Sequence, residues 1–427
     1  MKKKAMAVAL SILMTIPVMG GNVCAEEVAG DFSGVTIELA ERYTGTASEV
    51  FLELVEEFEK ESGCTVNVTE DGNDYENNMK TRMASGELPD IFQTHGWSIL
   101  RYKEYLLDLS DEPWVSDYDE SALGVIQDED DSIYVLMTSE GALGTLVNLD
   151  ICEEAGVDPY ALRTWDDFEE ACQKIKDSGY TPIGNITNPG LLANIAGTYC
   201  SYEGELAEDS EKMLDGSWDF ASYRPLLEKY AKWIESGYFY DDVMTMSESD
   251  LAQRFAENKA AFQIGNEPAF LMTCLELNPD GNYAMLPSFA SKEGGKLFVG
   301  IGEQDTFGIW KDSENIEACK AFLSFMAQPE NAVRLSKATG SLTCLKSGMD
   351  ADDGYALRTF KEMQDKYAEE NILYENLWDR EYMPSGMWQI FGNAMNMLFD
   401  DSSEEGIDET LQYLLENYQD LYDNAQG

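Results

Sequence analysis

The sequence predicts an α/β fold divided into two domains. In the first third of the chain, short apolar strands alternate with amphipathic helices, which predicts a parallel sheet covered by helices. The chain has 427 residues, more than a single hydrophobic core commonly serves. Because 44% of the residues are hydrophobic and 11% are aromatic, there is enough apolar surface to bury two cores.

The first predicted elements are two strands with a helix between them. Residues 35–40 form an apolar strand, and residues 64–69 alternate apolar and polar side chains as a second strand. The intervening helix ends near Gly63, and its apolar face comprises Val50, Phe51, Leu54, Val55 and Phe58. A second helix over residues 75–85 leads to a third strand that starts at residues 89–92. In α/β sheets, ligands bind at the loops that follow such strands.

The segment from Leu146 to Lys176 is predicted as a strand followed by two helices. Thr164 can cap the second helix, because its hydroxyl can accept from the amide of Asp167 while the Asp167 carboxylate reaches back to the cap. Gly179 ends this helix, whose apolar face comprises Phe168, Ala171, Cys172 and Ile175.

The remaining chain is mostly helical, with three further strands. Strands are predicted over residues 260–264, 283–286 and 296–300. Amphipathic patterns predict helices over residues 223–236, 250–258, 317–326, 329–337, 388–399 and 409–424.

The N-terminus is predicted to be an export signal, residues 1–25. Three lysines precede an apolar run over residues 5–19, and small side chains at Val23 and Ala25 mark a cleavage site before Glu26. The run is shorter than the roughly 20 residues that span a membrane. Cys24 leaves a second interpretation open, in which the exported protein keeps a lipid anchor on this cysteine at the cell surface or in the periplasm.

The formal net charge is −52 at pH 7, with 81 acidic residues against 29 basic residues. Such a surface repels nucleic-acid phosphates and anionic lipids, so we expect no nucleic-acid partner. The apolar content argues against disorder, and the charge is interpreted as a solvated surface.

The sequence predicts no catalytic residue, no metal and no cofactor. The chain has a single histidine, His95, and none of its eight cysteines lies in a CxxC or zinc-ligand spacing. No P-loop, HExxH or dinucleotide-binding motif occurs. A glycoside hydrolase with a carboxylate pair stays open as an alternative, since an acidic and aromatic exported chain offers such pairs by chance.

Five segments, in order along the chain, resemble the extracytoplasmic solute-binding proteins of carbohydrate ABC transporters, a family that includes maltose-binding-like proteins. They are FLELVEEFEKESGCTVNV (51–68), MASGELPDIF (83–92), LVNLDICEEAGVDPYALRTWDDFEEACQKIK (146–176), FAENKAAFQIGNE (255–267), and residues 298–342, which begin FVGIGEQDTFGIW. The resemblance implies a non-enzymatic, monomeric receptor that captures a carbohydrate and delivers it to a membrane permease. A receptor for a non-sugar solute is the remaining alternative.

The resemblance also implies a periplasmic-binding-protein-like fold of two lobes, joined by three hinge crossovers, with a ligand cleft between them. The crossovers are expected near residues 138–142, 301–306 and 343–347. The N-terminal lobe would then comprise residues 31–140 plus 305–344. The C-terminal lobe would comprise residues 141–304 plus 345–427.

Loop aromatics and charged side chains in matching places are the predicted sugar contacts. Sugars offer hydroxyls for hydrogen bonds and C–H faces for stacking on aromatic rings. The candidates are Arg42, Tyr43, Trp97, Glu140, Glu267, Glu303, Asp305, Trp378, Asp379 and Trp388.

Two positions depart from the family pattern. Glu267 stands where the family commonly has tryptophan after the strand ending in Gly265, and Asn188-Pro189-Gly190 stands where another stacking aromatic is common. Both changes replace a flat sugar platform with a polar or flexible group. We therefore expect a small, hydroxyl-rich sugar, an amino sugar or a polyol as readily as a long maltodextrin.

Overall fold

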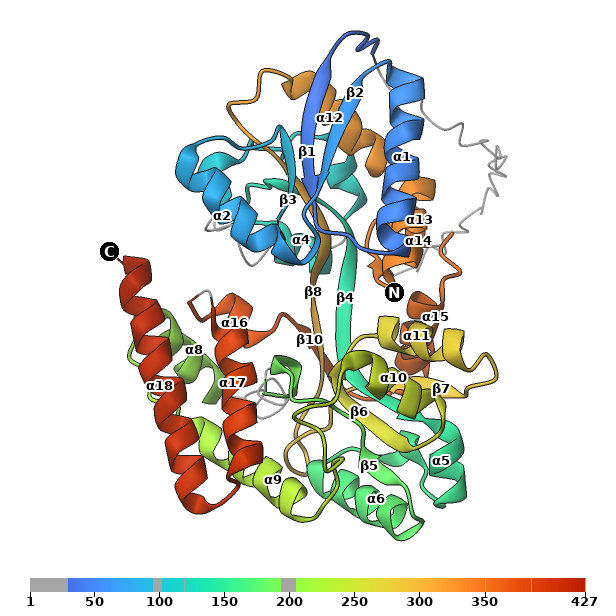
Figure 1. Ribbon diagram of the computed structural model, residues 1–427, viewed down its shortest axis with the longest axis vertical. Helices are drawn as coiled ribbons and strands as arrows, with labels where there is room; N and C mark the ends of the chain where they lie inside the picture. Colours follow the sequence, from blue (N-terminus) through green and yellow to red (C-terminus); the bar gives the residue numbers. More distant parts are fainter. Residues whose placement is uncertain are drawn as a thin grey trace, which may run out of the picture.

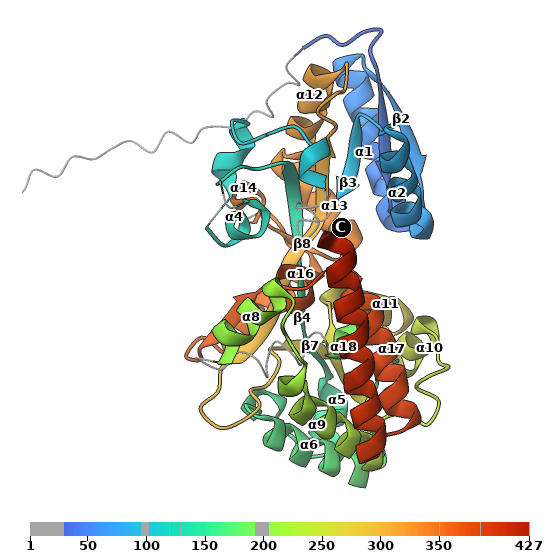
Figure 2. The same ribbon diagram turned by 90° about the vertical axis from the view of Figure 1, so that its left-hand side faces the viewer.

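Two long strands, β4 (Val135–Asn148) and β8 (Leu297–Ile309), run between an N-terminal and a C-terminal lobe (Figure 1). The computed structural model describes residues 30–94, 102–118, 120–128, 130–192, 205–349, 351–384 and 386–426. The predicted signal peptide, Cys24, His95 and Trp97 lie outside these ranges. Seen from the side, the lobes stand one above the other with β4 and β8 between them (Figure 2).

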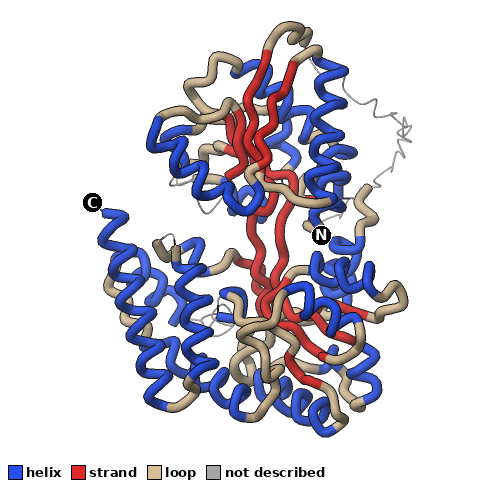
Figure 3. Tube along the Cα trace, in the orientation of Figure 1, coloured by secondary structure: helices blue, strands red, loops and turns tan. Residues whose placement is uncertain are grey.

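Within the described ranges the strands form one mixed sheet, in the order β2-β1-β3-β8-β4-β6-β5, with β7 and β9 also paired to β4 and β10 to β8. The sheet continues from one lobe into the other (Figure 3). Besides β4 and β8, the strands are β1 (Thr36–Glu41), β2 (Thr65–Glu70), β3 (Ile91–Thr94), β5 (Thr181–Ile183), β6 (Ala260–Asn266), β7 (Tyr283–Leu286), β9 (Leu342–Thr343) and β10 (Ile372–Glu375).

The predicted parallel sheet is present in the N-terminal lobe but does not extend across it. β1 pairs parallel with both β2 and β3, as the strand–helix alternation predicts. β8 instead runs antiparallel to β3 and β4. The reason is that β8 enters from the other lobe, and its 13 residues far exceed the short strand predicted at residues 296–300.

Helices cover the sheet in both lobes. In the N-terminal lobe α1, α12 and α13 pack against one another, and in the C-terminal lobe α17 and α18 pair and both contact α9. The helices are α1 (Thr46–Ser62), α2 (Tyr75–Ser85), α4 (Glu120–Ile126), α5 (Leu149–Glu154), α6 (Trp165–Asp177), α8 (Glu205–Asp215), α9 (Arg224–Glu235), α10 (Glu248–Ala256), α11 (Pro268–Leu277), α12 (Ile316–Met326), α13 (Pro329–Thr339), α14 (Lys346–Met349), α15 (Tyr355–Lys366), α16 (Trp378–Glu381), α17 (Met387–Asp400) and α18 (Glu404–Gln426).

The start of α6 confirms the predicted capping box. The Thr164 hydroxyl accepts from the Asp167 amide at 3.1 Å, and the Asp167 carboxylate accepts from the Thr164 amide at 2.9 Å. These bonds satisfy amides that have no partner inside the helix. The apolar stripe of α6 is buried as expected, including Phe168 and Cys172. Its last helical residue is Asp177, two residues before the predicted stop at Gly179.

Two separate hydrophobic cores define the lobes. One draws its buried residues from Ile37 to Met137 and from Phe307 to Leu345. The other draws them from Ala142 to Ile301 and from Leu342 to Tyr418. The chain therefore passes between the cores three times, which confirms the two-lobe fold with three crossovers.

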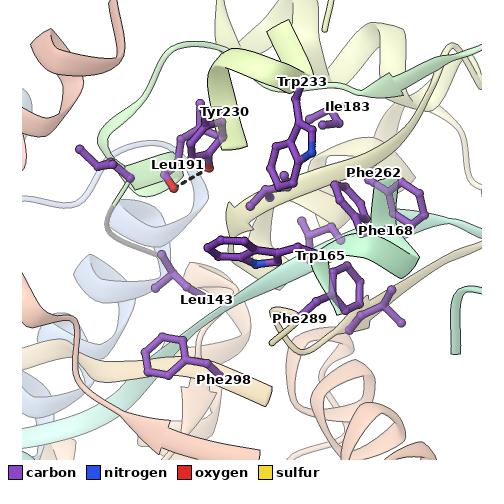
Figure 4. Close-up of a cluster of buried hydrophobic side chains, with 14 of the residues drawn as sticks. Leu143, Trp165, Phe168, Ile183, Leu191, Tyr230, Trp233, Phe262, Phe289 and Phe298 are labelled. Atoms are coloured by element: carbon purple, nitrogen blue, oxygen red, sulfur yellow. Dashed lines mark hydrogen bonds between the residues drawn. The ribbon is translucent and has the colours of Figure 1, made fainter. Parts of the chain in front are cut away.

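The core of the C-terminal lobe is built on aromatic contacts (Figure 4). Phe168 of α6 meets the rings of Trp233 and Phe262 edge-on, with centroids 5.4 and 5.1 Å apart. The buried Tyr230 hydroxyl donates to the Leu191 carbonyl at 2.7 Å, so its polar end is satisfied. This packing fills the interior of the C-terminal lobe.

Candidate binding cleft

A cleft of about 790 Å³ opens between the lobes. This volume lies within the roughly 300–1,000 Å³ of small-molecule sites. Its N-terminal wall comes from the loops after β1 and β2, from α2 and from the end of α13, and its C-terminal wall from residues 379–389. The lining residues are Arg42, Tyr43, Thr44, Thr46, Ala47, Gly72, Tyr75, Lys80, Gln304, Asp305, Ala338, Thr339, Asp379, Arg380, Met383, Gly386, Met387, Trp388 and Gln389.

Asp305 of β8 is the anchor of the N-terminal wall. Its buried carboxylate accepts from the Tyr43 hydroxyl at 2.9 Å, from the Thr339 hydroxyl at 3.2 Å and from the Ser139 hydroxyl. Burial raises the pKa of Asp305, and the three hydroxyl donors oppose that rise. The network joins the ends of β1 and α13 to β4 and β8, so it fixes the wall beside the hinge.

Arg42 follows β1 and is held by backbone and amide groups. Its guanidinium donates to the Gln304 carbonyl at 2.7 Å, and its own amide donates to the Gln93 side chain at 2.6 Å. The side chain is half-buried and lines the cleft. A guanidinium presents five N–H donors, a chemistry suited to a hydroxyl or carboxylate that enters the cleft.

The C-terminal wall combines a carboxylate, a guanidinium and an indole between residues 379 and 388. Asp379 is only 7% exposed, and its Oδ1 has no hydrogen-bond partner among the described residues. Burial raises the pKa of Asp379 to about 6, although Arg380 opposes this. The Arg380 guanidinium lies over the Trp388 ring, 5.4 Å from its centroid, and Trp388 remains 37% exposed. This wall can accept hydroxyl protons, donate to oxygens and stack on a sugar face.

Three other predicted carboxylates lie near the hinge and do not line the cleft. Glu140 of β4 and Glu303 of β8 are opposite each other in the antiparallel pair. Glu267 precedes α11, and a Cβ at Gly141 would lie 2.8 Å from its Oε1, so the absence of a side chain at Gly141 makes room for it. Burial raises the pKa of Glu267, while Arg380 and Arg42 lower it.

The structure therefore brings part of the predicted set together. Arg42, Tyr43, Asp305, Asp379 and Trp388 line one cleft. Trp97 lies outside the described residues, and Trp378 lies in α16 with its side chain outside the description. Sugar contact by any of these side chains stays a prediction.

Sequence reasoning missed Lys80, Gln304, Thr339 and Arg380 as lining residues. Arg380 directly follows the predicted contacts Trp378 and Asp379, and Gln304 lies between Glu303 and Asp305. Their position next to predicted contacts could have identified both as candidates. Lys80 sits on α2, and nothing local distinguishes it from other exposed lysines.

In the described part of the chain, no group of three or more His, Cys, Asp and Glu side chains is placed to hold a metal ion. No described helix is both long and apolar enough to cross a membrane. The six described cysteines are buried, and none forms a disulfide with another described cysteine.

Comparison with known proteins finds a solute-binding family and a sugar-binding relative. Residues 44–333 match the family described as bacterial extracellular solute-binding protein. The melibiose/raffinose/stachyose-binding protein MelE of Bacillus subtilis is 29% identical over 401 residues, covering 90% of this chain and 88% of MelE.

Solved structures agree with this fold. A Bacillus subtilis binding protein, msme, solved in an open conformation, superposes with a TM-score of 0.82 at 26% identity, over 93% of this chain and 100% of that one. A sugar transporter protein of Bacillus licheniformis in complex with stachyose gives a TM-score of 0.75 at 26% identity, over 91% of this chain and 100% of that one.

Proposed function

This chain belongs to the bacterial extracellular solute-binding protein family, and from that premise we propose that it is the substrate-binding component of an ABC importer for an oligosaccharide. It captures the sugar in the cleft between its lobes, closes about the hinge and delivers its cargo to a membrane permease. The observation that carries the proposal is the interlobe cleft, whose two walls bring together Arg42, Asp305, Asp379 and Trp388.

The names of the relatives support an oligosaccharide as cargo. MelE is named for melibiose, raffinose and stachyose, and the Bacillus licheniformis protein holds stachyose. The cleft has the chemistry for such a ligand, because acceptor carboxylates, donor guanidinium groups and an exposed indole face the same space.

Closure needs contacts that exist only when the lobes meet around a ligand. The ligand stabilises the closed form by the free energy of those extra contacts and by nothing else. Residues from both lobes line the cleft, Tyr43 and Asp305 on one side and Asp379 and Trp388 on the other. A sugar that reaches both walls therefore favours closure.

The proposal also covers the oligomeric state of the protein, the boundaries of its lobes and its export. The protein acts as a monomer, without catalysis and without nucleic acid. Its lobes comprise residues 31–140 plus 305–344 and residues 141–304 plus 345–427, a division that the two cores support. Residues 1–25 export it, and attachment of a lipid at Cys24 is the alternative to plain cleavage.

A thermal-shift screen tests the function. The mature chain is heated with melibiose, raffinose, stachyose, other oligosaccharides, polyols and amino sugars, and the sugars are then checked for products by chromatography. Ligand at about one hundred times its Kd adds about 2.7 kcal/mol and raises the Tm by a few degrees.

We expect a shift with one sugar class and no products. Product formation would instead favour the glycoside hydrolase. An absence of any shift would favour a receptor for a non-sugar solute.

A further inference from the structure

We infer that the cargo of this cleft is an acidic oligosaccharide, one that carries the carboxylate of a hexuronate residue. The inference rests on the proposed function and narrows it to a substrate class. It follows from the charges that line the cleft, from their partners and from the place of one guanidinium beside the exposed indole.

The charge balance of the cleft is opposite to that of the whole chain. Acidic residues outnumber basic residues 81 to 29 in the sequence. The cleft is nevertheless lined by Arg42, Lys80 and Arg380, against Asp305 and Asp379. A positive site in so acidic a molecule favours an anion locally, because low-dielectric walls concentrate the field inside a cleft.

Two of these cations, one on each wall, form no ion pair among the described residues. Lys80 lies on α2, and Arg380 on α16 places its guanidinium over the Trp388 ring, where its charge also lowers the pKa values of Asp379 and Glu267. By contrast Arg82, two residues after Lys80, is paired with Asp71 at 2.6 Å. With no ion pair at salt-bridge distance in the described ranges, both cations can donate to a group that enters the cleft.

The carboxylates of the cleft do not cancel this charge. Asp305 already receives three hydroxyl donors, from Tyr43, Ser139 and Thr339. Asp379 is buried next to Arg380, and burial raises its pKa to about 6 although the arginine opposes the rise, so this carboxylate offsets one of the three cations at neutral pH. Glu267 lies beside Gly141, is not a lining residue, and partly offsets the charge of Arg380 and Arg42.

Arg380 and Trp388 place a stacking surface and a cation side by side. The guanidinium lies over the indole, 5.4 Å from the ring centroid, so a sugar that contacts the exposed part of Trp388 from beside Arg380 can present a substituent to the guanidinium. A planar guanidinium binds a carboxylate through two parallel N–H donors, which a hydroxyl cannot match. The Asp379 Oδ1, without a partner in the described chain, can accept from a neighbouring sugar hydroxyl.

The test is calorimetric titration of the mature chain with three matched ligands. These are trigalacturonate, its methyl ester, which keeps the hydroxyls but removes the charges, and raffinose as a neutral trisaccharide. We expect trigalacturonate to bind roughly ten- to a hundredfold more tightly than its ester. That preference should shrink as salt is raised.

Three variants locate the effect. Arg380→Met and Lys80→Met should each reduce the preference for the acid over the ester, measured as the ratio of the two dissociation constants within the same variant. Lys60→Met is the matched control, because Lys60 is an exposed lysine near the far end of α1 and pairs with Glu56 within the described part of the chain. It removes one charge outside the cleft and should leave the preference intact.

The outcomes separate the two proposals. Binding of raffinose with no preference for acid over ester overturns the acidic cargo and leaves the sugar receptor standing. An acid preference that survives both Arg380→Met and Lys80→Met also overturns the inference, because other residues must then bind the ligand's carboxylate. No binding by any of the three ligands or by the oligosaccharides of the thermal-shift screen overturns the receptor proposal as well.

Discussion

The Tyr43 hydroxyl donates a 2.9 Å hydrogen bond to the Asp305 carboxylate, which joins the loop after β1 to β8 across 262 positions of sequence. Both side chains are buried, although both line the cleft. Burial raises the pKa of Tyr43 well above its ordinary value, so the hydroxyl keeps its proton and acts as a donor. The bond therefore holds the cleft wall rigid beside the hinge.

Replacing Tyr43 by phenylalanine removes one donor from a buried carboxylate. We expect Tyr43→Phe to destabilise the protein by about 1–2 kcal/mol, because Asp305 then loses part of its compensation for burial. Calorimetric melting at pH 7 measures the effect. Tyr105→Phe is the control, since the Tyr105 hydroxyl makes no hydrogen bond within the described residues, and an equal loss in both variants would contradict the assignment.

The capping box of α6 makes a local contribution to stability. Thr164→Ala leaves the Asp167 amide without its partner and should cost about 1 kcal/mol. Thr164→Ser keeps the oxygen and should recover most of the loss. Urea denaturation followed by circular dichroism compares the three proteins, and equal stability of the alanine and serine variants would show that the hydroxyl is not the cause.

Glu41 gives the stability a specific pH dependence. Its side chain is fully buried, and burial raises its pKa from 4.5 to about 7, with the Tyr43 amide opposing the rise. Between these two pH values the folded protein keeps a proton that the unfolded chain releases, so the free energy of unfolding falls as pH rises through the window.

Glu41→Gln removes that titration and should gain about 1–3 kcal/mol over the wild type above pH 7, with little difference below pH 4.5. Melting temperatures of both proteins from pH 4 to 8 test this. Glu49→Gln, at an exposed position in the first turn of α1, is the control. Curves that stay parallel for Glu41→Gln and the wild type would contradict the shifted pKa.

We expect Trp388 to contribute to ligand affinity and little to folding stability. It is 37% exposed on the cleft wall, so Trp388→Ala should weaken sugar binding about tenfold or more while stability changes by less than about 1 kcal/mol. Titration calorimetry and melting measure the two effects separately. Leu214→Ala, at a 58% exposed position of α8, is the control for a lost apolar surface. Normal affinity in Trp388→Ala would remove Trp388 from the proposed contacts.

Local patterns predicted the elements well because their causes are local. The Thr164 cap, the buried stripe of α6 and the α2 bounds at residues 75–85 depend on residues within a few turns of each other. The resemblance supplied what local patterns could not, namely the order of the lobes and the place of Trp388. Its family has been confirmed by the match over residues 44–333.

The position of Glu140 depends on geometry that no local pattern encodes. The pairing of β4 with β8 shifts register on both sides of Ser139, and such an irregularity changes which face the following side chains occupy. Glu140 therefore lies opposite Glu303 in the strand pair instead of among the cleft-lining residues. Lys80 is the opposite case, a residue that no local pattern predicted but that lines the cleft. It does so because of how α2 is placed relative to the other lobe.

Small-angle X-ray scattering of the mature protein, with and without the oligosaccharide that binds in titration, tests the central claim most directly. Closure of two lobes about β4 and β8 predicts a smaller radius of gyration at saturating ligand, with the sugar recovered intact. An unchanged radius of gyration at proven saturation would contradict capture by closure, and a cleaved sugar would contradict the receptor.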